Sequence, residues 1–208
     1  MTVKYKLLYF DLAGRGEVSR LLLHQSGVEF EDYRVKGKDE WPSLKKDMPF
    51  GQLPVLQVFT DEGTKMLAQS NAIARFIARS HGMDGKDTWE SAQCDMLVDV
   101  MGDIQDLYIK WKFGGDEGKE EKKAKLLESV PLFLTRMTKF IEANPSKSGY
   151  LVGSELTWTD VCLAYTLDIL KGVEPNIAAD HPKIQEHQEK IWSQPRIKAY
   201  RTKQERPT

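Results

Sequence analysis

The spacing of apolar residues changes near residue 81, and this change constrains the fold more than any other feature of the chain. Before it, short strand-like segments alternate with helix-like ones, in the order β-α-β, a connector, then β-β-α. After it, every periodic segment has helical spacing. We therefore predict an α/β domain over residues 1–80 and an all-helical domain over residues 88–208. The linker between them, residues 81–87, carries two glycines.

Residue types place the individual elements. Strands are predicted at Lys4–Phe10, Glu29–Val35, Val55–Phe59 and Lys65–Leu67. A helix between the first two strands ends at Gly27, and Ser70 is expected to cap the helix that follows the fourth strand. The connector from residue 41 to 48 is expected to be a short irregular helix or a loop. In the helical part, Thr157 and Asp160 have the spacing of a capping box.

Charge and composition exclude several classes of protein. Thirty Lys and Arg residues stand against 31 Asp and Glu, so the chain lacks the basic surplus of a nucleic-acid or anionic-membrane binder. No apolar run is long enough to cross a membrane or to form a signal core. Two cysteines, Cys94 and Cys162, are too few for a disulfide framework and are expected to be buried small hydrophobes. We expect a cytoplasmic protein.

Pro54 stands directly before the third predicted strand. A β-α-β then β-β-α unit with a proline in this place is typical of thioredoxin-like folds. In that fold the proline follows a cis bond, and the backbone of the preceding residue, here Leu53, pairs with an extended peptide. Redox members of the fold carry a cysteine near the start of the first helix, but residues 11–18 contain none. A reactive sulfur must therefore arrive with a ligand.

Seven segments make the chain resemble a sigma-class cytosolic glutathione transferase, the class that includes many invertebrate and nematode enzymes and the haematopoietic prostaglandin D synthases. They occur in family order and span nearly the whole chain: Tyr5–Phe10, Gly14–Glu17, Phe30–Arg34, Pro49–Leu56, Gln69–Phe76, Leu151–Gly153 and Leu156–Asp160. The resemblance implies a thioredoxin-like domain followed by a helical domain, a homodimer, and glutathione as the co-substrate.

Chemistry and resemblance together give Tyr9 the catalytic role. A free thiol has a pKa near 8.5, and lowering it by about two units takes roughly 2.7 kcal/mol. One hydrogen bond to a charged group supplies about 1.5–3 kcal/mol, and a helix N-terminus adds about 0.3–1 kcal/mol. A tyrosine hydroxyl at the end of the first strand is therefore sufficient to hold a glutathione thiolate. The alternative is that Tyr9 is a strand aromatic that only packs.

The resemblance also implies the residues that bind glutathione. They are Arg15 beside the thiolate, Trp41, Lys45, Gln52, Leu53 and Pro54 around the glycyl end and the peptide, and Gln69 and Ser70 at the γ-glutamyl end. Backbone N–H groups at a helix start bind carboxylates, which favours the assignment of Ser70. Alternatively, Ser70 is a plain N-cap, and Arg15 forms a salt bridge within the first helix.

Four acids, Asp95, Asp99, Asp103 and Asp106, follow the polar edge of the first long helix, and a solvated face would explain them. In the family, an aspartate of this helix reaches the ammonium group of the neighbouring chain's glutathione, and Asp103 matches it. Some prostaglandin synthases bind a divalent cation here through adjacent acids. Because Gly102 precedes Asp103, we expect no metal.

The second substrate is expected to contact residues from both domains. The candidates are Phe10, Leu12, Gly14, Trp111, Cys162 and Tyr165, each of which is also a candidate core residue. The predicted function is conjugation of the glutathione thiolate to hydrophobic electrophiles. Two alternatives stay open: glutathione-dependent isomerisation to prostaglandin D, which would use the same thiolate, and non-enzymatic carriage of haem or another lipophilic ligand.

Overall fold

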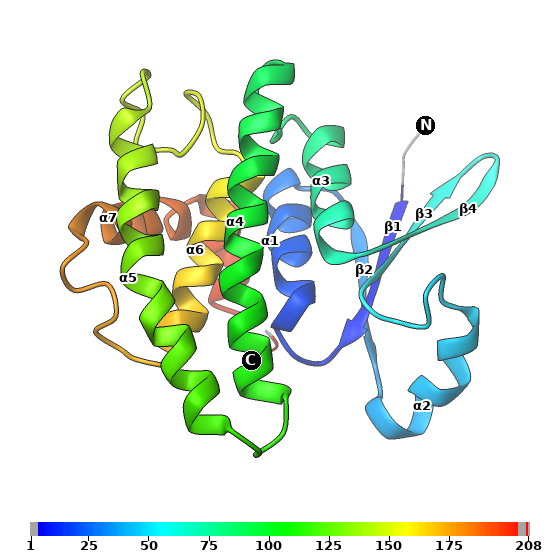
Figure 1. Ribbon diagram of the computed structural model, residues 1–208. Helices are drawn as coiled ribbons and strands as arrows, with labels where there is room; N and C mark the ends of the chain where they lie inside the picture. Colours follow the sequence, from blue (N-terminus) through cyan, green and yellow to red (C-terminus); the bar gives the residue numbers. More distant parts are fainter. Residues whose placement is uncertain (1–3, 204–206, 208) are drawn as a thin grey trace. The chain divides into compact units, whose positions relative to one another are not determined.

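The computed structural model describes residues 4–203 and residue 207 (Figure 1). Contacts divide the chain into two compact units. The first unit runs to Gly82 and resumes at Ser193, and the second covers Met83–Trp192.

The first unit is built on a four-stranded sheet with the strand order β2-β1-β3-β4 (Figure 1). The strands are β1 (Lys4–Phe10), β2 (Phe30–Val35), β3 (Val55–Thr60) and β4 (Gly63–Ala68). β1 pairs with β2 in parallel, and β3 runs antiparallel to both of its neighbours, β1 and β4. All four predicted strands are confirmed to within one or two residues at each end.

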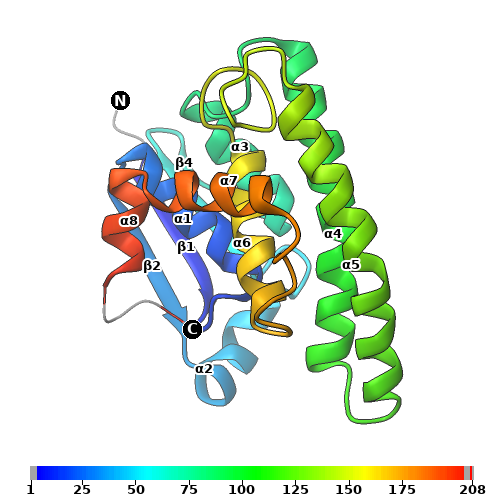
Figure 2. The ribbon, with the colours of Figure 1, turned by 90° about the vertical axis from the view of Figure 1, so that its left-hand side faces the viewer.

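Helices cover the sheet and complete this unit. They are α1 (Glu17–Ser26), α2 (Gly37–Leu44), α3 (Ser70–Ser80) and α8 (Pro195–Arg201). α1 contacts both α3 and α8 (Figure 2). As predicted, α1 ends at Gly27, whose φ of 73° is the left-handed conformation that glycine adopts most readily. The connector expected to be irregular is α2 followed by a 3-10 turn at Lys45–Asp47.

Successive residues of β1 point to opposite faces of the sheet, as the pleat requires. Leu8 belongs to an apolar cluster with Val35, Met48 and Val55, and Trp41 of α2 packs against that cluster. Leu7, which is completely buried, points to the other face. The alternation therefore fixes which side of the sheet each residue of β1 serves, including Tyr9.

The start of α3 differs from the prediction by one residue. Ser70 is the first residue of the helix, and Gln69 occupies the capping position with a φ of 74° and no side-chain cap bond. The Gln69 carbonyl accepts the Ile73 N–H at 2.9 Å. Serine is a good capping residue by composition, but the left-handed backbone that begins the helix lies at residue 69.

The second unit consists of helices: α4 (Thr88–Phe113), α5 (Lys119–Ala143), α6 (Trp158–Lys171) and α7 (Pro182–Trp192). α4 contacts α5 and α6, and α7 contacts α5 and α6. All residues of α6 from Trp158 to Leu167 are buried, so α6 is the central helix of this unit. Within the described residues, no helix has the length and apolar character needed to cross a bilayer. The predicted fold class, an α/β part followed by helices, is confirmed.

The predicted capping box of α6 is present. The Thr157 N–H donates to Asp160 Oδ2 at 2.8 Å, and Oδ1 of the same carboxylate accepts the Leu151 N–H at 2.8 Å and pairs with His187 Nε2 at 2.9 Å. Asp160 is completely buried. One carboxylate therefore joins the start of α6, the loop before it and α7, because a buried charge is stable where hydrogen bonds satisfy it.

The C-terminal helix, α8, packs against α1. α8 lies within the predicted 88–208 segment, but it belongs to the first unit by contact. The Tyr200 ring stacks on the His24 ring of α1 at 4.3 Å, and Arg196 Nη1 donates to the Gln25 carbonyl at 3.1 Å. Helical spacing predicts α8 but carries no signal about which surface it covers.

Candidate active site

Tyr9 lies near the end of β1, where the strand leads into α1. Its side chain is 7% exposed. Its hydroxyl oxygen accepts a hydrogen bond from the backbone N–H of Arg15 at 3.0 Å, in the 3-10 turn Gly14–Gly16 that precedes α1. The phenol therefore sits at the start of a helix, where unpaired N–H groups and the helix dipole favour negative charge.

Two glycines make room for this phenol. A Cβ atom on Gly14 would lie 2.7 Å from the Tyr9 hydroxyl oxygen, and one on Gly16 would lie 2.5 Å from Tyr9 Cδ1. Both distances are far below van der Waals contact. Gly14 also has a φ of 39°, which side chains disfavour. The absence of side chains at both positions lets the ring lie against the turn.

Burial raises the pKa of the Tyr9 hydroxyl, and the Arg15 N–H and the charges of Arg20 and Arg15 oppose this shift only in part. The net direction is upward from the ordinary value of 10. The phenol therefore keeps its proton at neutral pH. Because its oxygen already accepts the Arg15 N–H, the remaining O–H can donate to an anionic acceptor.

The sheet register brings five of the predicted glutathione residues to the end of the sheet where Tyr9 lies. Leu8 is opposite Val55, and Val55 is opposite Ala68. The segment before β3, with Gln52, Leu53 and Pro54, and the segment after β4, with Gln69 and Ser70, therefore both lie at the end where β1 stops.

The Leu53–Pro54 peptide bond is cis. Among residues 4–203 and 207, no hydrogen bond engages the Leu53 backbone amide or carbonyl. Both groups are available to an extended peptide. Gln52 and Gln69 are exposed, and Ser70 is half-buried at the first turn of α3.

Trp41 and Lys45 come from α2 and the 3-10 turn after it. The Trp41 ring meets Phe10 edge to face at 5.6 Å, and Trp41 is half-buried. Lys45 is exposed. Arg15 also has an exposed side chain, although its backbone N–H is the group that contacts Tyr9.

The remaining predicted residues belong to two different units. Phe10, Leu12 and Gly14 follow Tyr9 in the first unit, and Asp103, Trp111, Cys162 and Tyr165 lie on α4 and α6 of the second. Asp103 is exposed. Trp111 meets Tyr108 edge to face at 5.8 Å, and Tyr165 is buried. In the part of the chain that the structure describes, no three His, Cys, Asp or Glu side chains are grouped to hold a metal ion.

Both cysteines are buried free thiols, as predicted. Cys94 has no exposed surface, and burial raises the pKa of its thiol to about 11. Cys162 is 3% exposed. The Cys94 thiol therefore lacks the lowered pKa of a nucleophilic cysteine.

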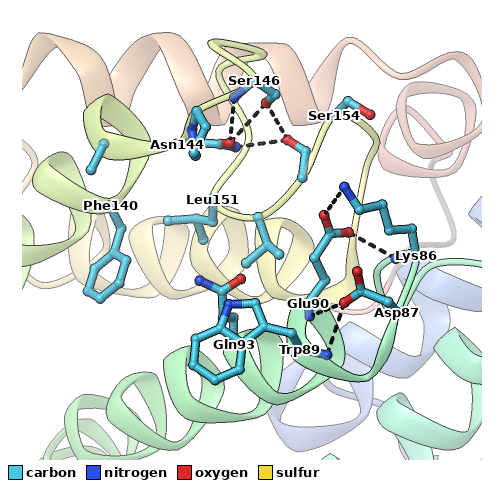
Figure 3. A pocket seen from close by; sticks show the side chains of 14 residues that line it. Lys86, Asp87, Trp89, Glu90, Gln93, Phe140, Asn144, Ser146, Leu151 and Ser154 are labelled. Carbon is cyan, nitrogen blue, oxygen red and sulfur yellow. Dashed lines mark hydrogen bonds and ion pairs between the residues drawn. The ribbon is translucent and has the colours of Figure 1, made fainter.

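A separate cavity of about 440 Å³ lies within the second unit (Figure 3). Phe140 and Leu151 stand on one side of it and Lys86 and Asp87 on the other. Its polar groups bond to one another: Asp87 caps α4 by accepting the N–H groups of Trp89 and Glu90, and Glu90 pairs with Lys86 at 3.1 Å. No residue predicted for the active site lines this cavity.

Sequence reasoning missed two features around Tyr9. The first is the steric need for glycine at position 16. The second is a buried charge pair on α1, in which Arg20 Nη1 lies 3.7 Å from Glu17 Oε2. Both side chains are completely buried. The only signals in the sequence were the Gly-Arg-Gly turn and opposite charges three residues apart.

A mixed sheet of order β2-β1-β3-β4 with a cis proline before β3 defines the thioredoxin-like class of folds, here without a cysteine in its first turn and followed by helices. Within that class, two family models match: the glutathione S-transferase N-terminal domain over residues 5–79 and the C-terminal domain over residues 102–204. The chain belongs to the glutathione S-transferase family and is an enzyme of that family.

Individual relatives agree with this assignment. The chain is 40% identical over 207 residues to a probable glutathione S-transferase 5 of Caenorhabditis elegans, with 95% of each chain covered. It is 33% identical to the solved structure of prostaglandin synthase D of Nilaparvata lugens, with a TM-score of 0.85, covering 99% of this chain and 100% of that one. It is 37% identical to a monomeric glutathione S-transferase of the hookworm Necator americanus, with a TM-score of 0.82 and 95% of each chain covered.

Proposed function

We propose that this transferase conjugates the glutathione thiolate to hydrophobic electrophiles, with Tyr9 as the catalytic residue. The observation that carries the proposal is the buried Tyr9 hydroxyl, which accepts the Arg15 N–H at 3.0 Å and keeps its own proton to donate. A bound thiolate accepts that proton in a hydrogen bond and stays anionic. The thiolate sulfur then attacks the electrophilic carbon, forming the carbon–sulfur bond as the leaving group departs with the electron pair.

The magnitude of this interaction is sufficient. A hydrogen bond to a charged group contributes about 1.5–3 kcal/mol, and a helix N-terminus about 0.3–1 kcal/mol. Their sum covers the roughly 2.7 kcal/mol that lowers a thiol pKa by about two units. No general base is required.

The rest of the tripeptide is proposed to bind along the edge where β1 and β4 end and β3 begins. Its peptide pairs with the Leu53 backbone, beside Gln52 and Pro54. Trp41 and Lys45 hold the glycyl carboxylate. Gln69 and Ser70 hold the γ-glutamyl carboxylate, which the N–H groups at the start of α3 favour. Arg15 supports the thiolate side.

Replacement of the Tyr9 hydroxyl tests the proposal. In Tyr9→Phe we expect turnover with an aromatic halide to fall roughly 10- to 100-fold at neutral pH, while glutathione affinity changes only a few-fold. Tyr5→Phe is the matched control, because Tyr5 is a buried tyrosine on the same strand whose hydroxyl contacts His81 at 3.2 Å. Unchanged turnover in Tyr9→Phe would remove Tyr9 from the mechanism.

A second candidate is isomerisation of a prostaglandin endoperoxide to prostaglandin D. The likeness to the prostaglandin synthase of Nilaparvata lugens favours it. Because both reactions would use the same thiolate, Tyr9→Phe does not separate them. Direct comparison of turnover on an aromatic halide and on the endoperoxide does, and equal or faster endoperoxide turnover would make isomerisation the principal activity.

We further propose that the protein is a sigma-class enzyme of the cytoplasm, acts in detoxification and forms a homodimer. Large apolar side chains on the outer surfaces of α4 and α5 support the dimer: Met96 is 45% exposed and Leu132 55% exposed. Such side chains are suited to burial against a second copy. In the dimer, Asp103 is proposed to bind the ammonium group of the neighbouring chain's glutathione, while Phe10, Leu12, Gly14, Trp111, Cys162 and Tyr165 contact the electrophile.

A further inference from the structure

Arg20 is a completely buried arginine of α1 whose guanidinium group lies beneath the active-site turn. Its Nη1 donates to the Leu12 carbonyl at 2.9 Å and its Nη2 to the Phe10 carbonyl at 3.2 Å. These carbonyls belong to the residues that leave β1 directly after Tyr9. One planar group therefore holds the chain at two points of the connection from β1 to α1.

Two carboxylates hold the guanidinium group in turn. Arg20 Nε donates to Asp32 Oδ1 of β2 at 2.9 Å, and Nη1 lies 3.7 Å from Glu17 Oε2. The arginine is thereby joined to the neighbouring strand and to its own helix. A buried charge is stable only when it is paired in this way.

The C-terminal helix supplies the next contact. The Tyr200 hydroxyl of α8 donates to Glu17 Oε2 at 3.0 Å, and Glu17 is completely buried. α8 and α1 lie side by side in the first unit (Figure 2). A continuous set of hydrogen bonds and ion pairs therefore runs from Tyr200 through Glu17 to Arg20, and from Arg20 to the backbone beside Tyr9.

The position of Tyr9 depends on this connection. The Tyr9 hydroxyl meets the Arg15 N–H only if the five residues between them follow their present path. The Arg20 guanidinium carbon also lies 5.6 Å from the Tyr9 ring centroid, so its charge acts on the ring directly. A lysine could keep the charge but could not fork to two carbonyls and a carboxylate at once.

We propose that Arg20 is a positioning residue for Tyr9, and that Tyr200 of α8 supports it through Glu17. The proposal rests on the proposed role of Tyr9. Its consequence is that the ionisation of bound glutathione depends on a helix that contributes no residue to the predicted site.

The test measures the pKa of the glutathione thiol bound to each variant, from thiolate absorbance as a function of pH, together with kcat, KM for glutathione and thermal stability. In Arg20→Lys we expect the thiol pKa to rise by about one unit and kcat at neutral pH to fall about threefold because less of the bound thiol is ionised, with KM changed by less than about threefold. Tyr200→Phe removes one hydroxyl. In this variant we also expect the thiol pKa to rise and kcat to fall, the latter about two- to threefold.

Arg34→Lys is the matched control. Arg34 also donates to Asp32, at 3.2 Å to Oδ2, but its second hydrogen bond goes to the exposed Asp11 carboxylate rather than to the β1–α1 backbone. We expect Arg34→Lys to leave the thiol pKa unchanged. If the thiol pKa rises as much in Arg34→Lys as in Arg20→Lys, loss of any partner of Asp32 is enough to raise it. That result would overturn the role given to Arg20.

Loss of thermal stability with an unchanged thiol pKa and kcat in the folded Arg20→Lys and Tyr200→Phe proteins would also overturn the proposal. If Arg20→Lys does not fold, the isosteric Tyr200→Phe decides, and an unchanged thiol pKa there refutes it. Tyr9→Phe is measured in parallel. If Tyr9→Phe raises the thiol pKa but the other two variants do not, only this inference fails; if Tyr9→Phe has no effect, the proposed function fails.

Discussion

At position 16 a missing side chain determines where the Tyr9 ring can lie. The distance of 2.5 Å between a Cβ on Gly16 and Tyr9 Cδ1 leaves no space even for a methyl group. The φ of Gly16 is −87°, so alanine could adopt its backbone conformation without strain. The constraint at this residue is therefore steric.

We predict that Gly16→Ala lowers turnover at least about tenfold, because the ring must move away from the Arg15 N–H and lose part of a hydrogen bond to charge of about 1.5–3 kcal/mol. Measurement of kcat/KM together with thermal stability checks it. Gly102→Ala on α4 is the control, since within the described residues a Cβ there meets no heavy atom within 4 Å. Equal activity of both alanine variants would contradict the steric argument.

The sequence places the Gly14–Gly16 turn soon after Tyr9 but does not show which group of this turn contacts the phenol. The family pattern led to Arg15 through its charged side chain, yet that side chain is exposed and the backbone N–H is the contacting group. A sequence carries no signal that shows whether the side chain or the backbone N–H of Arg15 makes the contact. Arg20 was missed for a related reason: a charged residue on a helix suggests a solvated face, and its burial depends on carbonyls and acids brought in by tertiary structure.

Among the elements, α8 has a titratable contact with α1. His24 stacks on the Tyr200 ring, and burial, followed by the charge of Lys203, lowers the pKa of His24 to about 4. An unfolded histidine has a pKa near 6.5. Between these two values the unfolded chain binds more protons than the folded one, so stability falls as the pH falls from 6.5 towards 4.

We therefore predict that His24→Gln reduces the slope of the free energy of unfolding against pH in this window. The reduction corresponds to the uptake of at most about one proton on unfolding. Urea unfolding at a series of pH values measures the slope. His181→Gln, at a half-buried histidine beside the start of α7, is the control. A His24→Gln slope equal to that of the unaltered protein would contradict a lowered pKa of the half-buried His24.

Elements with regular apolar spacing were predicted, and the short irregular helix expected after residue 41 is also present. α8, at Pro195–Arg201, agrees with the prediction that every periodic segment after residue 81 is helical. α2 overlaps the connector that was predicted at residues 41–48 as a short irregular helix or a loop, and Pro42 lies inside this helix. Its Trp41 and Leu44 pack on the cluster around Leu8, so a tertiary contact rather than local periodicity supports that helix.

At the scale of the whole molecule, the proposed dimer makes the exposed apolar side chains of α4 and α5 part of an interface. We predict that Met96→Glu shifts the mass in solution from twice the chain mass of 23.8 kDa towards that mass, because a carboxylate is costly to bury without a partner. Light scattering after gel filtration measures it, with Met96→Leu as the conservative control. A Met96→Glu protein that stays dimeric would place the interface elsewhere.

The division of the chain into units was the hardest property to foresee at this scale. The change from alternating to purely helical spacing near residue 81 matches the end of the first unit at Gly82. The return of the chain to that unit at Ser193 depends on Tyr200 meeting both His24 and Glu17. The spacing of apolar residues indicates which face of a helix is apolar, but it does not indicate which surface that face packs against.

Both thiols of the chain are enclosed by packing, and Cys94 has a pKa of about 11. Under the proposed function, this protein binds alkylating agents in every catalytic cycle. An accessible cysteine would compete with glutathione for the electrophilic carbon. A single reaction would leave that cysteine alkylated. Cys94 has no exposed surface and a raised thiol pKa, so it does not compete with glutathione for the electrophile, and the catalyst survives repeated turnovers.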